Sequence, residues 1–358
     1  MSPNALSRTS SMGTPLDSTL PRILVLGLGD LGDKVTEGLV ENGPIEARCI
    51  SISEERLQLG TILAHRALTR RVGMGGFGIS NQFESATENT LMSLPEISPS
   101  MIGNDLVFIT AALEQEMGSP ASLALAQTAK AGGALVIGAV TMPHRRERSR
   151  LYSAVHTLRE MKDACDALVV VDSNRLERPP TDTYGTNIDS VASDLLSQLI
   201  GGIVETLSTR SLINIEFKEF AGIIRRSGFA ILGTGEANTS DRPEEAVRNA
   251  LNCPLLHISH DGFTGAYLHI RGDYSLTRAQ ASKVAELVSG ELVPLPSVIF
   301  GASTDRSLDD RLRVTLMLTG VKSPQLLSAY REIPIQMHQM EEEWELEQQL
   351  KIDLDLTY

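Results

Sequence analysis

The chain is poor in cysteine and in long apolar runs, and both shortages exclude classes of protein. Its three cysteines, Cys49, Cys165 and Cys253, are widely spaced and odd in number, which argues against a disulfide framework and against a zinc site. We therefore expect three reduced thiols in or near a core, and no metal. No apolar run reaches the roughly 18 residues that a membrane helix needs, so we expect no direct insertion into a membrane.

Positive charge is also scarce. The chain carries 32 Lys and Arg against 45 Asp and Glu, a formal net charge of -13. A nonspecific grip on nucleic acid requires cations that displace counterions from phosphate, so we expect no nucleic-acid partner. The first residues are rich in Ser, Thr and Pro and lack the apolar stretch of a secretory signal. We predict a disordered leader over residues 1–21 and a cytoplasmic protein.

From Arg22 onward, short apolar runs alternate with amphipathic segments, as expected when helices cross over between parallel strands. The runs are apolar at nearly every position, which predicts a sheet buried on both faces. A helix over 119–131 is indicated by Ser119 as a cap and by Gly132 and Gly133 at its end. The predicted strands are 22–28, 47–52, 105–110, 134–140 and 167–172. The fold class is therefore α/β with a Rossmann-like parallel sheet over residues 22–186.

The second half has a different texture. Apolar residues at three- and four-residue intervals predict a long central helix over 187–210, despite Gly201 and Gly202. Residues 211–320 predict a second, smaller α/β domain. Its strands are expected at 228–237, 265–273, 297–303 and 312–320, and its helices at 242–252 and 276–289. Residues 321–358 predict a charged helix and a tail.

The segment GLGDLG places Gly27, Gly29 and Gly32 between a strand and a helix, where backbone amides and the helix dipole can approach a phosphate. With Glu54 or Glu55 past the second strand, the pattern fits an NAD site. The simpler alternative is that the glycines serve a tight turn and close helix packing. No acid and base suited to hydride chemistry follow in the sequence, which disfavours an oxidoreductase.

Ordered segments along residues 22–320 resemble the prokaryotic tubulin homologue FtsZ. GLGDLGDKV is similar to its first phosphate loop and RVGMGGFG to its glycine-rich third loop. Later segments similar to that family include SNRL, LINIEF, AILGTGEA, NCPLL and DDRLRVTLMLTG. The resemblance implies a tubulin/FtsZ-like fold whose subunits polymerise head to tail and bind GTP or GDP.

The resemblance also implies site residues. The expected catalytic residues, Asn214, Glu216 and Glu219, match an N-x-D-x-x-D pattern that acts on the nucleotide of a neighbouring subunit. Glu147 matches a ribose contact, although its basic neighbours also fit a solvated turn, and Ser193 lies where the family has Asn or Asp beside guanine. The expected phosphate-binding residues are Gly27, Gly29, Gly32, Gly73, Gly75, Gly76, Gly118 and Ser119.

One segment departs from the family pattern. The family's signature loop reads GGGTGTG, but this chain has EQEMGSP at 114–120. Glu114 and Glu116 bring bulk and negative charge to a place where bare backbone is expected to face an anion. The sequence therefore favours a filament-related protein with impaired or absent GTP binding and hydrolysis, and the alternative is an active FtsZ-like GTPase.

The expected partners follow from the same resemblance. Head-to-tail contacts are expected with further copies of the chain or with an FtsZ-family relative. The tail KIDLDLTY, residues 351–358, alternates apolar and polar residues like an added edge strand. We interpret this tail as a candidate binding segment for an anchor protein.

Overall fold

The described part of the chain forms a single hydrogen-bonded sheet. The computed structural model describes residues 20–41, 46–53, 61–64, 67–73, 97–113, 118–144, 148–176, 188–208, 211–238, 243–256, 262–292 and 297–321. Its 11 strands follow the order β10-β9-β11-β8-β7-β6-β5-β1-β2-β4-β3. The predicted leader lies outside these residues apart from Leu20 and Pro21, and so do the charged segment and the tail.

The first half is built on a parallel sheet. From β4 through β2, β1, β5 and β6 to β7, every pair of neighbouring strands is parallel, and the short β3 adds antiparallel to β4 at the edge. Strands β1, β5, β6 and β7 are buried along their whole length, as predicted. The bounds are β1 Ile23–Leu28, β2 Arg48–Ser53, β3 Thr61–Ala64, β4 Ala67–Gly73, β5 Leu106–Ala112, β6 Leu135–Met142 and β7 Ala167–Asp172.

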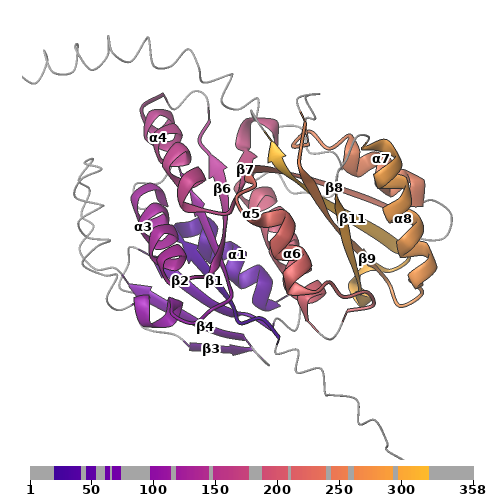
Figure 1. Cartoon of the computed structure of the whole chain (residues 1–358), viewed down its shortest axis with the longest axis horizontal. Coiled ribbons are helices and arrows are strands. Elements are labelled where there is room, and N and C mark those ends of the chain that lie inside the picture. Colours follow the sequence, from indigo (N-terminus) through magenta and orange to yellow (C-terminus); the bar gives the residue numbers. More distant parts are fainter. Residues whose placement is uncertain are drawn as a thin grey trace, which may run out of the picture.

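Helices cover both faces of this sheet. Helix α1 (Gly29–Glu41) and helix α5 (Ile188–Leu207) share one apolar core with the second half of the chain. Helix α3 (Gly118–Ala131) and helix α4 (Arg148–Ala164) pack into a separate core on the other face. Figure 1 shows α5 between the two halves, with the indigo and magenta elements on one side and the orange ones on the other.

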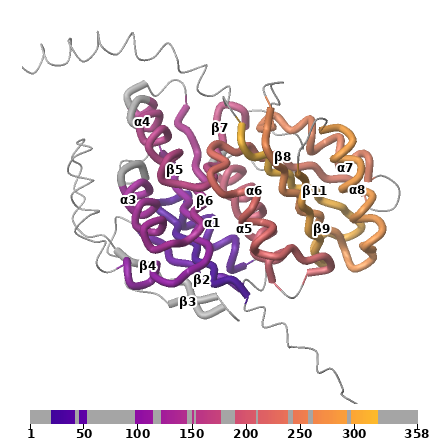
Figure 2. Tube along the Cα trace, viewed as in Figure 1, coloured from indigo at the N-terminus to yellow at the C-terminus, as the bar shows by residue number. Residues whose placement is uncertain are grey.

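The second half continues the same sheet. Strand β8 (Gly228–Asn238) pairs in parallel with the start of β7, and β11 (Arg311–Val321) lies antiparallel to both β8 and β9 (Gly265–Gly272). Strand β10 (Val298–Thr304) is parallel to β9. The remaining helices are α6 (Phe217–Ile224), α7 (Pro243–Leu251) and α8 (Arg278–Glu291). The Cα trace in Figure 2 shows α7 and α8 on the outer side of this half.

Most predicted elements are confirmed to within two residues, and five differences stand out. Ser119 lies inside α3 and not at its cap, because the helix already begins at Gly118. The basic segment that fits a solvated turn contributes Arg148 to α4. Strands β3 and β4 and helix α6 were not predicted. The domain boundaries stay a prediction.

The cysteines and the described helices follow the expectations from the sequence. All three cysteines are buried and unpaired, and burial raises the pKa of the Cys49 thiol, and likewise that of Cys165, to about 12. The thiols of Cys49 and Cys165 are therefore uncharged in the folded protein at neutral pH. Among the described helices, none combines the length and the apolar character needed to cross a bilayer.

Candidate functional site

The connections after β1 and β5 leave the carboxyl edge of the parallel sheet towards opposite faces. These two strands are adjacent, with Leu28 paired to Ala111. The helix after β1 covers one face of the sheet and the helix after β5 covers the other. In open α/β sheets, ligands bind at the point where connections leave to opposite faces. The helices α1 and α3 both begin at this edge, so two sets of unpaired amides are available to an anion there.

The three glycines of the first loop have different structural roles. A Cβ on Gly27 would lie 2.3 Å from the carbonyl oxygen of Gly32, and a Cβ on Gly32 would lie 2.3 Å from the carbonyl carbon of Gly27. This contact lets α1 sit directly against β1. Gly29 has a φ of 65°, which favours glycine. Close packing accounts for Gly27 and Gly32, and Gly29 is the glycine whose conformation shapes the turn from β1 into α1.

Other predicted phosphate-binding residues reach the same edge. Gly73 is the last residue of β4 and pairs with Ser53 at the end of β2, two strands and therefore roughly 10 Å from β1. Gly118 is the first residue of α3. Gly75, Gly76 and Glu147 lie outside the described residues, as does the side chain of Ser119, so their roles stay predictions.

The predicted guanine contact, Ser193, lies in the first half of α5. Its side chain is buried, at 3% exposure. Its hydroxyl donates to the backbone oxygen of Ser190 at 2.9 Å. The hydroxyl proton is therefore committed within the helix, and only the oxygen lone pairs are left for another group.

The predicted acidic loop lies at the other end of α5. Asn214, Glu216 and Glu219 are all exposed. Glu216 is the residue before α6 and makes no side-chain capping bond, and Glu219 lies in the first turn of that helix. All three polar side chains are thus presented to solvent along one short segment, which we call the acidic loop (residues 213–219).

The acidic loop and the glycine edge lie on opposite sides of the molecule. Helix α5 follows β7, which ends at the carboxyl edge, and its 20 residues span about 30 Å. The acidic loop begins beyond its far end. One subunit therefore does not bring the glycines and the acidic side chains together.

Backbone hydrogen bonds hold the acidic loop in place. The N–H of Ile213 donates to the oxygen of Ala302 at 3.0 Å, and Ala302 N–H donates back to Ile213 at 3.1 Å. The N–H of Ile215 donates to the oxygen of Thr206 at 2.8 Å, and the Ile215 side chain is buried. The apolar residues alternating with Asn214 and Glu216 were the only sequence signal for this anchoring.

Comparison with known proteins identifies the family of the chain. Residues 22–179 match the family model described as Tubulin/FtsZ family, GTPase domain, and residues 228–322 match FtsZ family, C-terminal domain. The cell division protein FtsZ 2 of Methanocaldococcus jannaschii is 33% identical over 320 residues, which cover 86% of this chain and 82% of that protein. FtsZ 2 of Haloferax volcanii is 31% identical over 315 residues, 86% of this chain and 77% of the relative.

Solved structures show the same likeness. An empty FtsZ dimer from M. jannaschii superposes with a TM-score of 0.76 at 30% identity, covering 86% of this chain and 90% of the other. A GTPγS-bound protofilament of CetZ2 from Haloferax volcanii shares the fold, with a TM-score of 0.66 at 18% identity over 88% and 99% of the two chains. These matches support a tubulin-like fold over a dehydrogenase. The chain belongs to the FtsZ family.

Proposed function

We propose that this chain is a filament subunit of the FtsZ type that joins head to tail with copies of itself or with an FtsZ relative. We also propose that its own affinity for guanine nucleotide is low, which we call the weak grip. The observation that carries the head-to-tail part is the placement of the acidic loop and the glycine edge at opposite ends of α5. The relatives named as cell division proteins support a role in cell division or in a related cytoskeleton.

The acidic loop is the surface that we propose to face the nucleotide of the next subunit. Glu216 and Glu219 are exposed, and their backbone is anchored to Thr206 and to Ala302. Carboxylates on a rigid segment suit the orientation of a water molecule against the nucleotide of the next subunit. The chain is therefore proposed to support hydrolysis in a neighbour.

The weak grip is proposed from the segment between β5 and α3. Leu113 follows β5 and Gly118 begins α3. Four residues join them, and two of these are Glu114 and Glu116. A carboxylate ~5 Å from a phosphate charge at an effective dielectric near 20 is repelled by roughly 3 kcal/mol, which is over a hundredfold in affinity. The committed hydroxyl proton of Ser193 adds no donor for the base.

Calorimetry with GTP and GDP in magnesium tests the weak grip. We expect the natural chain to bind far more weakly than a variant carrying Glu114→Gly and Glu116→Gly, by about a hundredfold or more. A Glu114→Gln, Glu116→Gln variant separates charge from bulk, because only the charge is removed. As a matched control, Glu244→Gln with Glu245→Gln changes net charge equally at the exposed first turn of α7. Micromolar binding by the natural chain would favour the active GTPase instead.

Mixed filaments test the head-to-tail part. The chain is combined with a GTP-hydrolysing FtsZ relative, and pelleted polymer and GTP turnover are both measured. We expect turnover to fall when Glu216 and Glu219 become alanine, because the neighbour's site loses its carboxylates. Alanines at Glu244 and Glu245 serve as the control. Unchanged turnover in the Glu216, Glu219 variant would defeat the proposal.

The tail at 351–358 stays a predicted anchor-binding segment, and its deletion tests that prediction.

A further inference from the structure

A buried polar cluster lies between the last turns of α5 and the strands β9 and β10. Glu205 of α5 accepts from Nη2 of Arg271 through Oε1 at 2.6 Å and from the hydroxyl of Ser303 through Oε2 at 2.6 Å. The Glu205 side chain is 17% exposed and that of Arg271 is 13% exposed. Arg271 also lies 3.5 Å from a carboxylate oxygen of Asp305. One carboxylate of α5 is thus shared by two strands of the second half.

His269 extends this cluster inward. Its Nε2 lies 3.0 Å from the Ser303 hydroxyl oxygen. Because that hydroxyl donates its proton to Glu205, His269 is the donor to Ser303 and carries its proton on Nε2. The imidazole is therefore not positioned as a base for the serine, and the three residues do not form a hydrolytic triad. The cluster is a structural hydrogen-bond relay.

Close packing on either side of Glu205 fixes the position of α5 along the sheet. A Cβ on Gly202 would lie 2.4 Å from Nδ1 of His269, and a Cβ on Gly301 would lie 2.1 Å from Cγ2 of Thr206. The helix and the strands therefore pack closely at two positions where a glycine has no side chain, and Glu205 lies between these positions. A shift of the helix along the strands would break both carboxylate contacts and make both glycine contacts clash.

Glu205 also binds the segment that leads into the acidic loop. Its backbone oxygen accepts from the N–H of Ser208 at 3.1 Å and from the Ser208 hydroxyl at 2.8 Å. The hydroxyl of Ser211 donates to the same oxygen. The side chain of Glu205 thus binds two strands while its carbonyl group binds the segment that leads into the loop.

We propose that Glu205 is a positioning residue for the acidic loop: together with Arg271 and Ser303, it fixes where α5 ends on the sheet and so where Asn214, Glu216 and Glu219 are presented to a neighbouring subunit. The inference rests on the proposed function only for what the loop does once it is in place. The carboxylate of Glu205 binds Arg271 and Ser303 of its own subunit, so its proposed role is to position the loop.

Hydrogen exchange on the full chain tests the positioning directly. Glu205→Gln keeps the shape of the side chain but removes its charge. We expect exchange at the amides of Ile213 and Ile215 to speed up by about tenfold to a hundredfold, the range expected for losing a hydrogen bond to a charged group. Arg271→Met should act in the same way, and Arg271→Lys should restore part of the protection because it keeps the charge. Exchange in β5 should stay unchanged.

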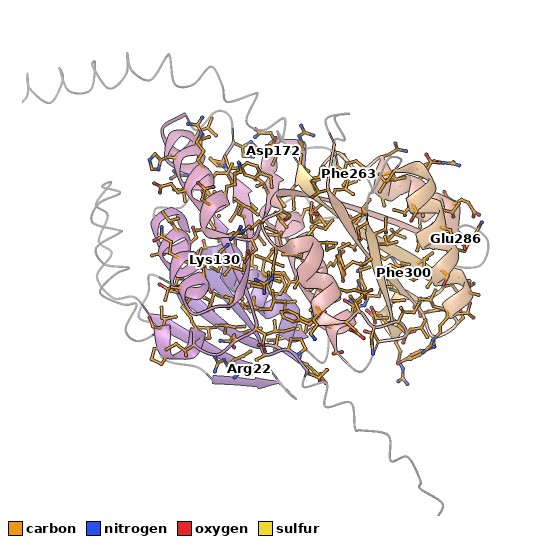
Figure 3. All side chains as sticks on the ribbon, in the orientation of Figure 1. Arg22, Lys130, Asp172, Phe263, Glu286 and Phe300 are labelled. Atoms are coloured by element: carbon orange, nitrogen blue, oxygen red, sulfur yellow. The ribbon has the colours of Figure 1, made fainter. Side chains whose placement is uncertain are left out.

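The matched control is Glu286→Gln. Glu286 forms an exposed ion pair with Lys283 at 3.9 Å, and Figure 3 shows it on the outer side of the second half, on α8. No change in loop exchange is expected for this variant. Unchanged exchange at Ile213 and Ile215 in Glu205→Gln, or an equal rise in β5, would overturn the positioning role, since the second result reports general destabilisation.

Turnover in mixed filaments separates this inference from the proposed function. Glu205→Gln should lower the neighbour's GTP turnover at an unchanged amount of polymer. If the Glu216, Glu219 double alanine lowers turnover and Glu205→Gln does not, the positioning role is wrong. If the double alanine itself has no effect, the proposed function fails, and hydrogen exchange alone decides whether Glu205 positions the loop.

Discussion

Acidification should destabilise this protein through His269. The side chain is 2% exposed, and burial, followed by the charges of Arg271 and Arg313, lowers its pKa from 6.5 to about 3. The carboxylate of Glu205 lies 3.7 Å from Nε2. Between these two pKa values the unfolded chain binds a proton that the folded chain does not. The contribution of the uncharged His269 to the free energy of unfolding is therefore fully present above pH 6.5 and is lost as the pH drops towards 3.

The size of the effect follows from the linkage relation. Between pH 7.5 and pH 5.0, a histidine with an unfolded pKa of 6.5 and a folded pKa near 3 removes about 2 kcal/mol from the free energy of unfolding. Urea unfolding of the natural chain and of His269→Gln at the two pH values measures this difference. We expect the natural chain to lose about 2 kcal/mol more than the variant between the two pH values.

The control for this prediction is another histidine. His156 on α4 is 52% exposed and lies 3.7 Å from Glu160, and His156→Gln should leave the pH dependence of the natural chain almost unchanged. Equal losses in the natural chain and in His269→Gln would refute the assignment, because the pH dependence would then arise from other groups.

Two further predictions concern packing. Gly27→Ala should destabilise the fold by about 1–3 kcal/mol, because its Cβ would meet the backbone of the opposing turn. Gly290→Ala on α8 is the control, because the space at that position is open, and it should be neutral or slightly stabilising. Thermal denaturation measures both variants. The thiols of Cys49, Cys165 and Cys253 should react with iodoacetamide only after unfolding, and alkylation of any of them in the native protein, followed by mass spectrometry, would contradict their burial.

Much of the fold was predictable because its signals are local. The apolar runs that became β5, β6 and β7 are continuous in the sequence, and the spacing that predicted α5 lies within one helix. Strands β3 and β4 carry weaker apolar patterns, since Arg70 and Arg71 interrupt the second of them. Local patterns therefore identified the strands with continuous apolar runs and missed β3 and β4, whose patterns are weaker.

The order of the motifs along the chain determined the family, and with it the glycine loop and the acidic loop. Only the tertiary structure showed that Gly27 and Gly32 pack against each other, and that α5 holds the acidic loop at the far end from the glycine edge. Arg271 lies 66 residues from Glu205 in the sequence, and Ser303 lies 98 residues from it. Their contact depends on the register of β9 against β10 and on the glycines that let α5 approach, and no local pattern encodes such a long-range pairing.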